Sequence, residues 1–123
     1  MLPKFRAWLK KEQKMDNYID HISWLEDELY CIGDGITYMV SAEDLELMQS
    51  TAMVDRDGRI IFEGDIVKMS KDVYSEPTYY EVVRHYGGAY RLESKQHGCE
   101  LWLRHTDCEV VGNVYENKEL LDA

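Results

Sequence analysis

Four side chains of the kinds that bind zinc lie close together near the C-terminal end of the chain: His97, Cys99, His105 and Cys108. Zinc fingers and ribbons hold the ion with two closely spaced ligand pairs. Here the candidate ligands are separated by one, five and two residues, which matches neither arrangement, and the apolar residues 101–103 between them are typical of a core strand. We therefore expect no metal and no cofactor, with reduced thiols in the core and histidines at the surface.

The same cysteines and histidines could instead supply a nucleophile and its base. A catalytic thiol needs a lowered pKa, which a helix N-terminus or a strand-to-helix turn provides, and neither Cys99 nor Cys108 lies at such a predicted position. Residues 87–88 are Gly-Gly, which is typical of a hairpin turn and not of a phosphate-binding loop. We expect no catalytic residues and a protein that is not an enzyme; a small metal-dependent hydrolase is the least favoured alternative.

A second group of residues suggests a calcium loop at first sight: Asp55, Asp57, Gly58, Glu63 and Asp65. The spacing does not fit such a loop, because Met53 stands where an acidic ligand would precede Asp55 and Gly64 stands where the closing Glu would fall. These carboxylates could also act as a general acid and base, but acids beside a surface hairpin lack the burial that raises a pKa toward neutrality. We expect them to be solvated turn residues.

The stretch that carries these carboxylates, residues 54–67, organises the predicted fold. Its Asp57-Gly58 step is a strong hairpin signal, because Gly freely adopts the positive φ that a tight turn requires. Gly64-Asp65 repeats the signal after a short apolar run, and a second apolar run follows. The stretch therefore predicts strand, turn, strand, turn and strand.

The N-terminal part contains one ambiguous segment. Residues 3–9 predict a strand and residues 10–14 a polar turn. The next apolar residues step by four and three, which is helical spacing, yet they are rich in aromatic and β-branched types, with an acidic cluster at 26–28 that suits a hairpin loop: Tyr18, Ile22, Leu25, Leu29 and Ile32. The residues alone leave helix and strands open. Gly33-Asp34-Gly35 ends the segment, residues 36–40 predict a strand, 41–45 a helical turn and 47–54 an extended run.

Beyond residue 67 the pattern predicts further short strands. Residues 78–86 and 89–92 form a second hairpin around Gly87-Gly88, residues 101–103 and 109–115 are strands, and the tail from Asn117 makes one helical turn. Many short strands with Gly turns favour a barrel or packed sheets. Residues 68–75 form a polar excursion, and we expect any partner site in a groove between this loop and the sheet, lined by aromatic residues that the core does not bury.

Composition narrows the classes of function. The chain has 123 residues, suits a single domain over 1–123, and its nine Tyr and three Trp argue against disorder. The net charge is −10, with thirteen Asp and Glu in residues 15–65 against Arg56 and Arg59 alone. Such a field repels nucleic-acid phosphates. We therefore expect a protein partner that this acidic segment steers, weakened by neutralisation of acidic side chains there: Asp16, Asp20, Glu26 and Asp27. A merely solvated acidic face and DNA mimicry are the alternatives.

Cysteine use and hydropathy predict the compartment. Three cysteines without paired spacing suit reduced thiols, so we expect no disulfide. No apolar run approaches the roughly 20 residues of a membrane span, and the first residues lack the apolar core of a signal peptide. The sequence predicts a cytoplasmic protein with no membrane contact.

Three separated pieces of sequence carry a family resemblance. They are residues 3–8 (Pro-Lys-Phe-Arg-Ala-Trp), the Leu-Met-Gln of 47–49 followed by Asp-Arg-Asp-Gly at 55–58 and Phe-Glu-Gly-Asp-Ile-Val at 62–67, and residues 110–117 (Val-Val-Gly-Asn-Val-Tyr-Glu-Asn). In this order they resemble the YopX family of small phage and prophage proteins. The family usually has an acid after the tryptophan and Thr-Gly after the Met-Gln piece, where Leu9 and Thr51-Ala52 stand here.

The resemblance favours strands over residues 18–32. It implies a protein in the cytoplasm of a bacterial host, with no characterised activity and no catalytic residues to carry over. We predict a mostly β chain, α+β at most, in which N-terminal strands (1–50) add to a small SH3-like barrel (51–123) with one or two short helical turns. Its predicted role is a non-catalytic, protein-binding accessory that acts on a host or phage protein. A nucleic-acid-binding small barrel is the first alternative, and a homo-oligomer is left open.

Overall fold

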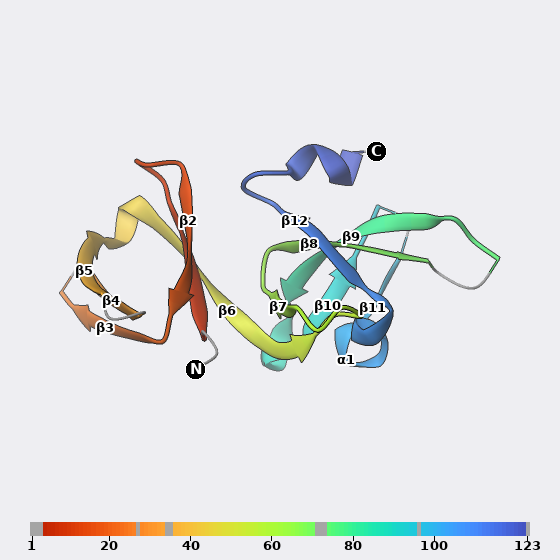
Figure 1. Ribbon diagram of the computed structural model, residues 1–123, viewed down its shortest axis with the longest axis horizontal. Coiled ribbons are helices and arrows are strands. Elements are labelled where there is room, and N and C mark those ends of the chain that lie inside the picture. Colours follow the sequence, from red (N-terminus) through yellow and green to blue (C-terminus); the bar gives the residue numbers. More distant parts are fainter. Residues whose placement is uncertain (1–3, 27, 34–35, 71–73, 96, 123) are drawn as a thin grey trace. The chain divides into compact units, whose positions relative to one another are not determined.

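Short antiparallel strands make up most of the chain in the computed structural model, which describes residues 4–26, 28–33, 36–70, 74–95 and 97–122 (Figure 1). The chain divides into two compact units, Met1–Ser50 and Thr51–Ala123, at the same position as the predicted boundary between N-terminal strands and barrel. The predicted mostly β class is confirmed. In the described residues no helix is long and apolar enough to cross a membrane.

The first unit contains two antiparallel sheets. In one, β1 lies between β2 and β6, and in the other, β4 lies between β3 and β5. The strands are β1 (Phe5–Leu9), β2 (Lys14–Ile19), β3 (His21–Leu25), β4 (Glu28–Gly33), β5 (Ile36–Ser41) and β6 (Leu45–Val54), with the 3₁₀ turn η1 (Ala42–Asp44) before β6. Residues 18–32 are therefore strands, as predicted, and the predicted helical turn at 41–45 is confirmed as η1.

Strands replace the helical spacing of residues 18–32, and Ile19 and Ile22 of this segment reach an apolar core. Ile22 on β3 and Tyr38 on β5 pack against the buried Ala7, Ile19 and Leu45. Glu26 takes a positive φ of 56° at the turn between β3 and β4, where the acidic loop was predicted. The remaining residue of that loop, Asp27, and the predicted break at Asp34 and Gly35 lie outside the described residues.

The second unit contains a five-stranded antiparallel sheet that curls into a half-barrel, in the order β11-β10-β9-β8-β12 (Figure 1). The strands of this sheet are β8 (Asp65–Ser70), β9 (Pro77–Arg84), β10 (Tyr90–Glu93), β11 (Gly98–Glu100) and β12 (Glu109–Asn113). A further strand of this unit, β7 (Ile60–Phe62), pairs with β6 instead. The helical turns are η2 (Tyr86–Gly88), α1 (Leu101–Arg104), η3 (His105–Asp107) and η4 (Lys118–Asp122). The closer SH3-like assignment stays a prediction.

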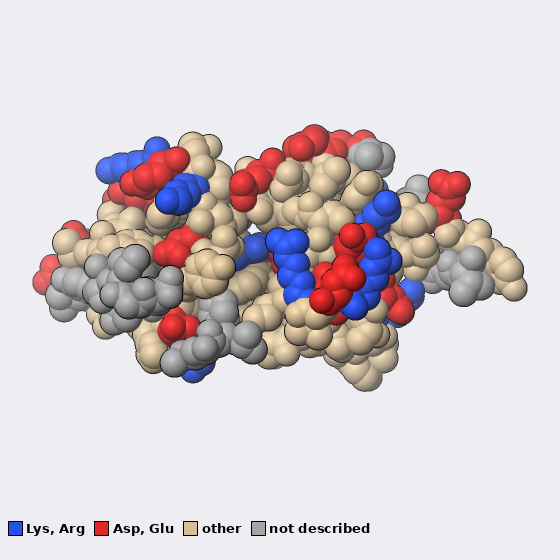
Figure 2. Space-filling view, in the orientation of Figure 1, with Lys and Arg blue, Asp and Glu red and all other residues tan. Residues whose placement is uncertain are grey.

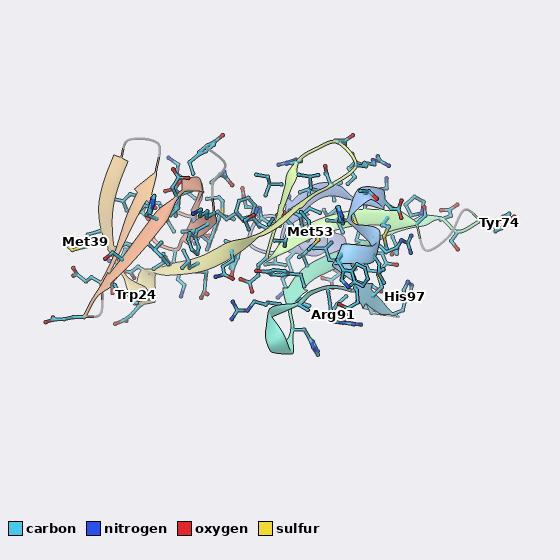
Figure 3. The ribbon with its side chains drawn as sticks, turned by 90° about the horizontal axis from the view of Figure 1, so that it is seen from below. Trp24, Met39, Met53, Tyr74, Arg91 and His97 are labelled. Atoms are coloured by element: carbon cyan, nitrogen blue, oxygen red, sulfur yellow. The ribbon has the colours of Figure 1, made fainter. Side chains whose placement is uncertain are left out.

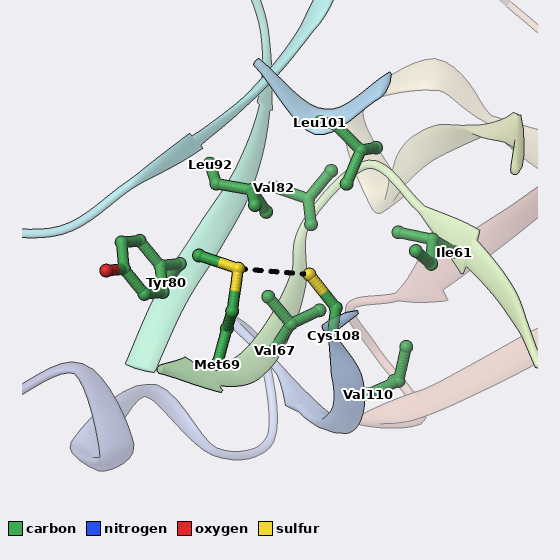
Figure 4. Packing of buried hydrophobic residues seen from close by; sticks show 9 residues of the cluster. All are labelled: Ile61, Val67, Met69, Tyr80, Val82, Leu92, Leu101, Cys108 and Val110. Atoms are coloured by element: carbon green, nitrogen blue, oxygen red, sulfur yellow. Dashed lines mark hydrogen bonds between the residues drawn. The ribbon is translucent and has the colours of Figure 1, made fainter. Parts of the chain in front are cut away.

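The core of the second unit lies inside this curl (Figure 4). Nine side chains pack together there: Ile61, Val67, Met69, Tyr80, Val82, Leu92, Leu101, Cys108 and Val110. Each aliphatic side chain that is removed from water in this way contributes about 1.5–3 kcal/mol. The Cys108 thiol donates toward Met69 Sδ at 3.8 Å, so both sulfur atoms belong to the core.

The prediction of a strand at residues 101–103 is wrong. These residues form the start of α1, in which Leu101 is fully buried while Leu103 is 58% exposed. A strand would have placed both leucines on one face. β11 and β12 lie at opposite edges of the five-stranded sheet and run in the same direction, so the segment between them crosses from one edge to the other; α1 begins this crossing with Leu101 in the core.

The three predicted glycine turns are confirmed in their conformation. Gly58 has a φ of 82° and Gly64 of 86°, and Gly87 and Gly88 both have positive φ between β9 and β10. At the first turn the loop is longer than a two-residue hairpin, because Asp55 N–H bonds Arg59 O at 2.8 Å and encloses the residues between them.

Ala52 adopts the left-handed conformation that glycine would take at the departure from the family pattern. Its φ is 63°, near the C-terminal end of β6. An L-residue pays about 1–2 kcal/mol for this backbone region, because its Cβ crowds the following carbonyl oxygen.

We expect Ala52→Gly to raise the free energy of unfolding by about 0.5–1 kcal/mol, since the relief of strain exceeds the added freedom of the unfolded chain. Chemical denaturation measures the change. Ala89→Gly is the matched control, because Ala89 has an ordinary φ of −73° and should lose stability on the same substitution. A loss of stability in both variants would contradict the strain at Ala52.

Candidate functional site

A hollow of about 480 Å³ lies on the second unit at the base of the β8–β9 loop. We call it the β8–β12 hollow; its lining is Arg56, Lys68, Met69, Ser70, Pro77, Arg104, Asp107 and Glu109. A hollow therefore exists beside the loop where the sequence analysis placed a groove. Most of its described lining residues are charged and none is aromatic, so the aromatic groove stays a prediction.

Aromatic side chains are exposed elsewhere. In the described residues Tyr74 is 96% exposed, and Figure 3 shows it at the tip of the β8–β9 loop, away from the sheet. Trp102 is 63% exposed on α1, and Trp24 is 59% exposed on β3. Trp8 and Tyr80 are buried.

Ion pairs hold the charged walls of the hollow in place. Arg56 Nη2 lies 2.8 Å from Glu109 Oε1. Arg104 Nε lies 2.9 Å from Asp107 Oδ2, and its Nη2 donates to the Ser70 carbonyl at 2.8 Å. Lys68 stands directly opposite Glu109 in the pairing of β8 with β12. The lining thus combines three cations with two carboxylates, and Figure 2 shows both signs of charge intermixed over β12.

A buried carboxylate positions Arg56. Asp55 is 3% exposed, and its Oδ1 accepts from Asp57 N–H and Arg59 N–H, while its Oδ2 accepts from Val110 N–H of β12, each at 2.9 Å. The Arg56 N–H donates in turn to Cys108 O at 2.9 Å. These bonds fix the loop against the start of β12 and bring the Arg56 side chain to Glu109.

The prediction that the carboxylates of this stretch are solvated is therefore wrong for two of them. Asp55 is a buried acceptor, and Asp65, which is 1% exposed, accepts from Phe62 N–H at 2.8 Å. A backbone N–H turned inward needs an acceptor once it is removed from water, and a short carboxylate at a turn supplies it. Sequence alone could not separate Asp55 from a solvated acid, because its partners include a strand far along the chain. The partner of Asp65 is local, three residues earlier in the chain.

The structure does not gather the four histidines and cysteines into one cluster. His97 Nε2 shares a hydrogen bond of 2.6 Å with Tyr80 Oη, and His105 Nδ1 donates to Val54 O at 2.8 Å. Cys108 is buried, and Cys99 is partly buried. Among the described residues, no three His, Cys, Asp or Glu side chains lie close enough to hold a metal ion.

Both thiols have raised pKa values. Burial raises the pKa of Cys108 to about 12, and burial likewise raises the pKa of Cys99. Desolvation disfavours the thiolate, which is the nucleophilic form. At neutral pH neither group has the activated state that nucleophilic catalysis uses.

The sequence analysis did not find the charge cluster of the hollow. Arg104 and Asp107 lie three residues apart, which brings them together on a helical turn, but the predicted strand over 101–103 hid this spacing. The approach of Arg56 to Glu109 depends on the packing of a loop on a distant strand. No local signal reports it.

The YopX protein family model matches residues 4–122. The chain belongs to the YopX family. Its fold is similar to that of the yopX protein of Bacillus subtilis, at 22% identity over 98% of this chain and 99% of that chain, with a TM-score of 0.69. It is also similar to protein EF1440 of Enterococcus faecalis, at 26% identity over the same shares of the two chains, with a TM-score of 0.63. A search of curated proteins finds no match.

The C-terminal YopX motif of this chain is a turn. Asn113 Oδ1 accepts from Tyr115 N–H at 3.0 Å and from Glu116 N–H at 2.9 Å. Asn117 Oδ1 accepts from Asn113 N–H at 3.2 Å, and a Cβ at Gly112 would lie 2.5 Å from that oxygen. The motif residues are thus engaged in holding the end of β12, as Asp55 holds its start.

We expect Asp55→Asn to lower the free energy of unfolding by about 2–4 kcal/mol, because an amide group presents a donor to buried N–H groups that need acceptors. Asp57→Asn is the control, since that side chain is 66% exposed and lies 4.0 Å from Arg56 Nε. It should change stability by less than about 0.5 kcal/mol. If the two variants unfold at the same denaturant concentration, Asp55 does not have this anchoring role.

We expect iodoacetamide at pH 8.5 to label Cys108 only in the unfolded chain, because the folded thiol stays protonated up to a pKa of about 12. An unfolded thiol ionises near its ordinary pKa of 9.0, so the stability that this group contributes falls as the pH rises above that value. Mass spectrometry of the labelled protein in a Cys31→Ser background counts the sites. Equal labelling rates of Cys108 with and without denaturant would contradict its burial.

Proposed function

We propose that this YopX family member is a non-catalytic accessory that binds another protein. The observation that carries the proposal is the exposure of two adjacent apolar side chains on α1, Trp102 at 63% and Leu103 at 58%. They directly precede Arg104, which lines the β8–β12 hollow. Trp and Arg side chains dominate the binding energy of protein interfaces, and charged side chains commonly surround them.

The chemistry of the hollow supports binding in place of catalysis. Its cations Arg56 and Arg104 are held by Glu109 and Asp107, and the lining residues that the structure describes include no histidine or cysteine. The nearby thiol of Cys108 is buried with a raised pKa. These groups can orient a ligand, but they do not form a nucleophile with its base.

Net charge favours a protein partner over a nucleic acid. A chain of net charge −10 repels a polyanion. Its acidic segment can steer a basic partner surface, although Asp16 is engaged in the fold through Tyr38 Oη–H at 2.6 Å and Tyr18 N–H at 3.1 Å. Asp20 and Glu26 are therefore better positions than Asp16 for a test of steering. The family likeness supports a phage or prophage origin and a partner from host or phage in the bacterial cytoplasm.

A nucleic-acid-binding small barrel is the second candidate, and the three cations of the hollow favour it. The two readings differ in their response to salt, because phosphate contacts weaken steeply as salt rises. Sub-micromolar binding of a random duplex or single strand at about 150 mM salt would support the nucleic-acid reading and oppose ours.

We expect Trp102→Ala to remove the specific partner from affinity captures without unfolding the chain, because the side chain is mostly exposed. Loss of an anchoring Trp at an interface costs 2 kcal/mol or more, which is about thirtyfold or more in affinity. Quantitative mass spectrometry of captures from host lysate, made with wild type and variant, measures the difference.

Leu101→Ala is the matched control on the same helical turn. Leu101 is fully buried, so its truncation should destabilise the chain by about 2–5 kcal/mol while leaving Trp102 in place. The captures are compared at a temperature at which both variants are folded. Loss of the partner in Trp102→Ala but not in Leu101→Ala then reflects the missing Trp102 side chain and not unfolding. If wild type and Trp102→Ala capture the same proteins in the same amounts, the proposal is wrong.

A further inference from the structure

We propose that the β8–β12 hollow binds a carboxylate side chain on a peptide segment of the partner, with Lys68 and Arg56 as the groups that grip it. This inference rests on the proposed protein-binding function and names the chemistry of the segment that is bound. Three features of the hollow carry it: the setting of Lys68, the way Glu109 holds Arg56, and the balance of charge in the lining.

Lys68 is a charged residue within a strand that is otherwise largely buried. Its neighbours Val67 and Met69 are 0% and 3% exposed, and β8 pairs with β12 on one side and β9 on the other. The base of the side chain is therefore held by two neighbouring strands, and Lys68 is one of the residues that line the hollow. Lys68 makes no ion pair with any residue that the structure describes, although Glu109 is its direct cross-strand neighbour.

Arg56 is the second cation beside the Glu109 carboxylate. Glu109 contacts its Nη2 at 2.8 Å, and Asp57 lies 4.0 Å from its Nε. The Arg56 side chain is 55% exposed, so the guanidinium is accessible from solvent. A guanidinium has five N–H donors and can bind a second carboxylate while it keeps the first.

Arg104 also lines the hollow and has a positioning role. It bridges Asp107 Oδ2 at 2.9 Å and the Ser70 carbonyl at 2.8 Å, which ties the η3 turn to the end of β8. Its side chain is 29% exposed, less than that of Arg56. The wall therefore stays in place and stays positive when a ligand enters.

The charge balance of the lining selects a single carboxylate over a row of phosphates. Three cations against the carboxylates of Asp107 and Glu109 leave an excess of one positive charge. One carboxylate matches this excess, whereas a phosphate dianion or a row of phosphates brings more negative charge than the excess neutralises. Trp102 and Leu103, exposed next to Arg104, offer apolar contact to the residues that flank the carboxylate. The bound segment is thus an acidic residue between apolar ones.

A titration with matched probes tests this inference. A blocked hexapeptide with one Glu between two Leu residues and its Gln counterpart are added to ¹⁵N-labelled full-length protein in about 150 mM salt. We expect the Glu peptide to shift the backbone resonances of residues 56, 68–70 and 104–109, with an affinity about tenfold above that of the Gln peptide, as a charge-assisted hydrogen bond gives.

Two lysine variants then test whether Lys68 binds the carboxylate of the peptide. Lys68→Met keeps the aliphatic stem, so the fold should survive while affinity for the Glu peptide drops about tenfold. Lys95→Ala is the matched control: Lys95 lies on the same unit, with its ammonium 3.7 Å from Asp122 and its side chain 69% exposed, and its loss should change affinity by less than about twofold. Thermal midpoints of both variants confirm that they are folded.

Several outcomes would overturn the inference. Equal affinity for the Glu and Gln peptides, equal loss in the lysine variants, or shifts outside the hollow would each do so. Inorganic phosphate and a short single-stranded oligonucleotide serve as further probes, and a stronger response of the hollow to either would assign it to phosphate ligands. If the peptides fail while Trp102→Ala still loses the captured partner, the inference falls and the proposed function stands.

Discussion

The second unit depends on one buried carboxylate. Asp55 accepts N–H groups from its own loop and from Val110 of β12, a strand that ends the five-stranded sheet. An edge strand with open N–H groups invites pairing with other chains, and the Asp55 loop occupies this edge at Val110. Because the loop is fixed there, Arg56 reaches Glu109, and the wall of the hollow is set by the same bonds that close the fold.

The short α1 turn links the core to the surface. Leu101 fills the interior of the half-barrel and the chain turns within one helical turn, so Trp102 and Leu103 face solvent while Arg104 reaches back to Ser70. The position of the exposed pair is therefore a consequence of the burial of its neighbour. A rigid support of this kind lowers the conformational entropy that is lost on binding.

The sequence motifs that identify the family are engaged in structure. Asp55, Asp65 and Asn113 satisfy backbone N–H groups at turns, and Gly112 leaves room for the Asn117 side chain. Membership of the YopX family consequently explains the fold of this chain without naming an activity. Function is then sought in side chains that do not hold these turns: the exposed α1 pair, Lys68, and the Arg56 side chain, whose position the motif fixes.

The sequence by itself determined the features that local chemistry controls. Turns at Gly58 and Gly87-Gly88 follow from the need for positive φ, the strands over 18–32 follow from residue types together with the family resemblance, and the charge of the chain follows from composition. The tertiary structure decided which groups meet. It replaced the predicted strand at 101–103 with α1, buried Asp55, and brought Arg56, Lys68 and Arg104 to one hollow. These outcomes depend on strand register and on packing between distant segments, whose energies no short stretch of sequence contains.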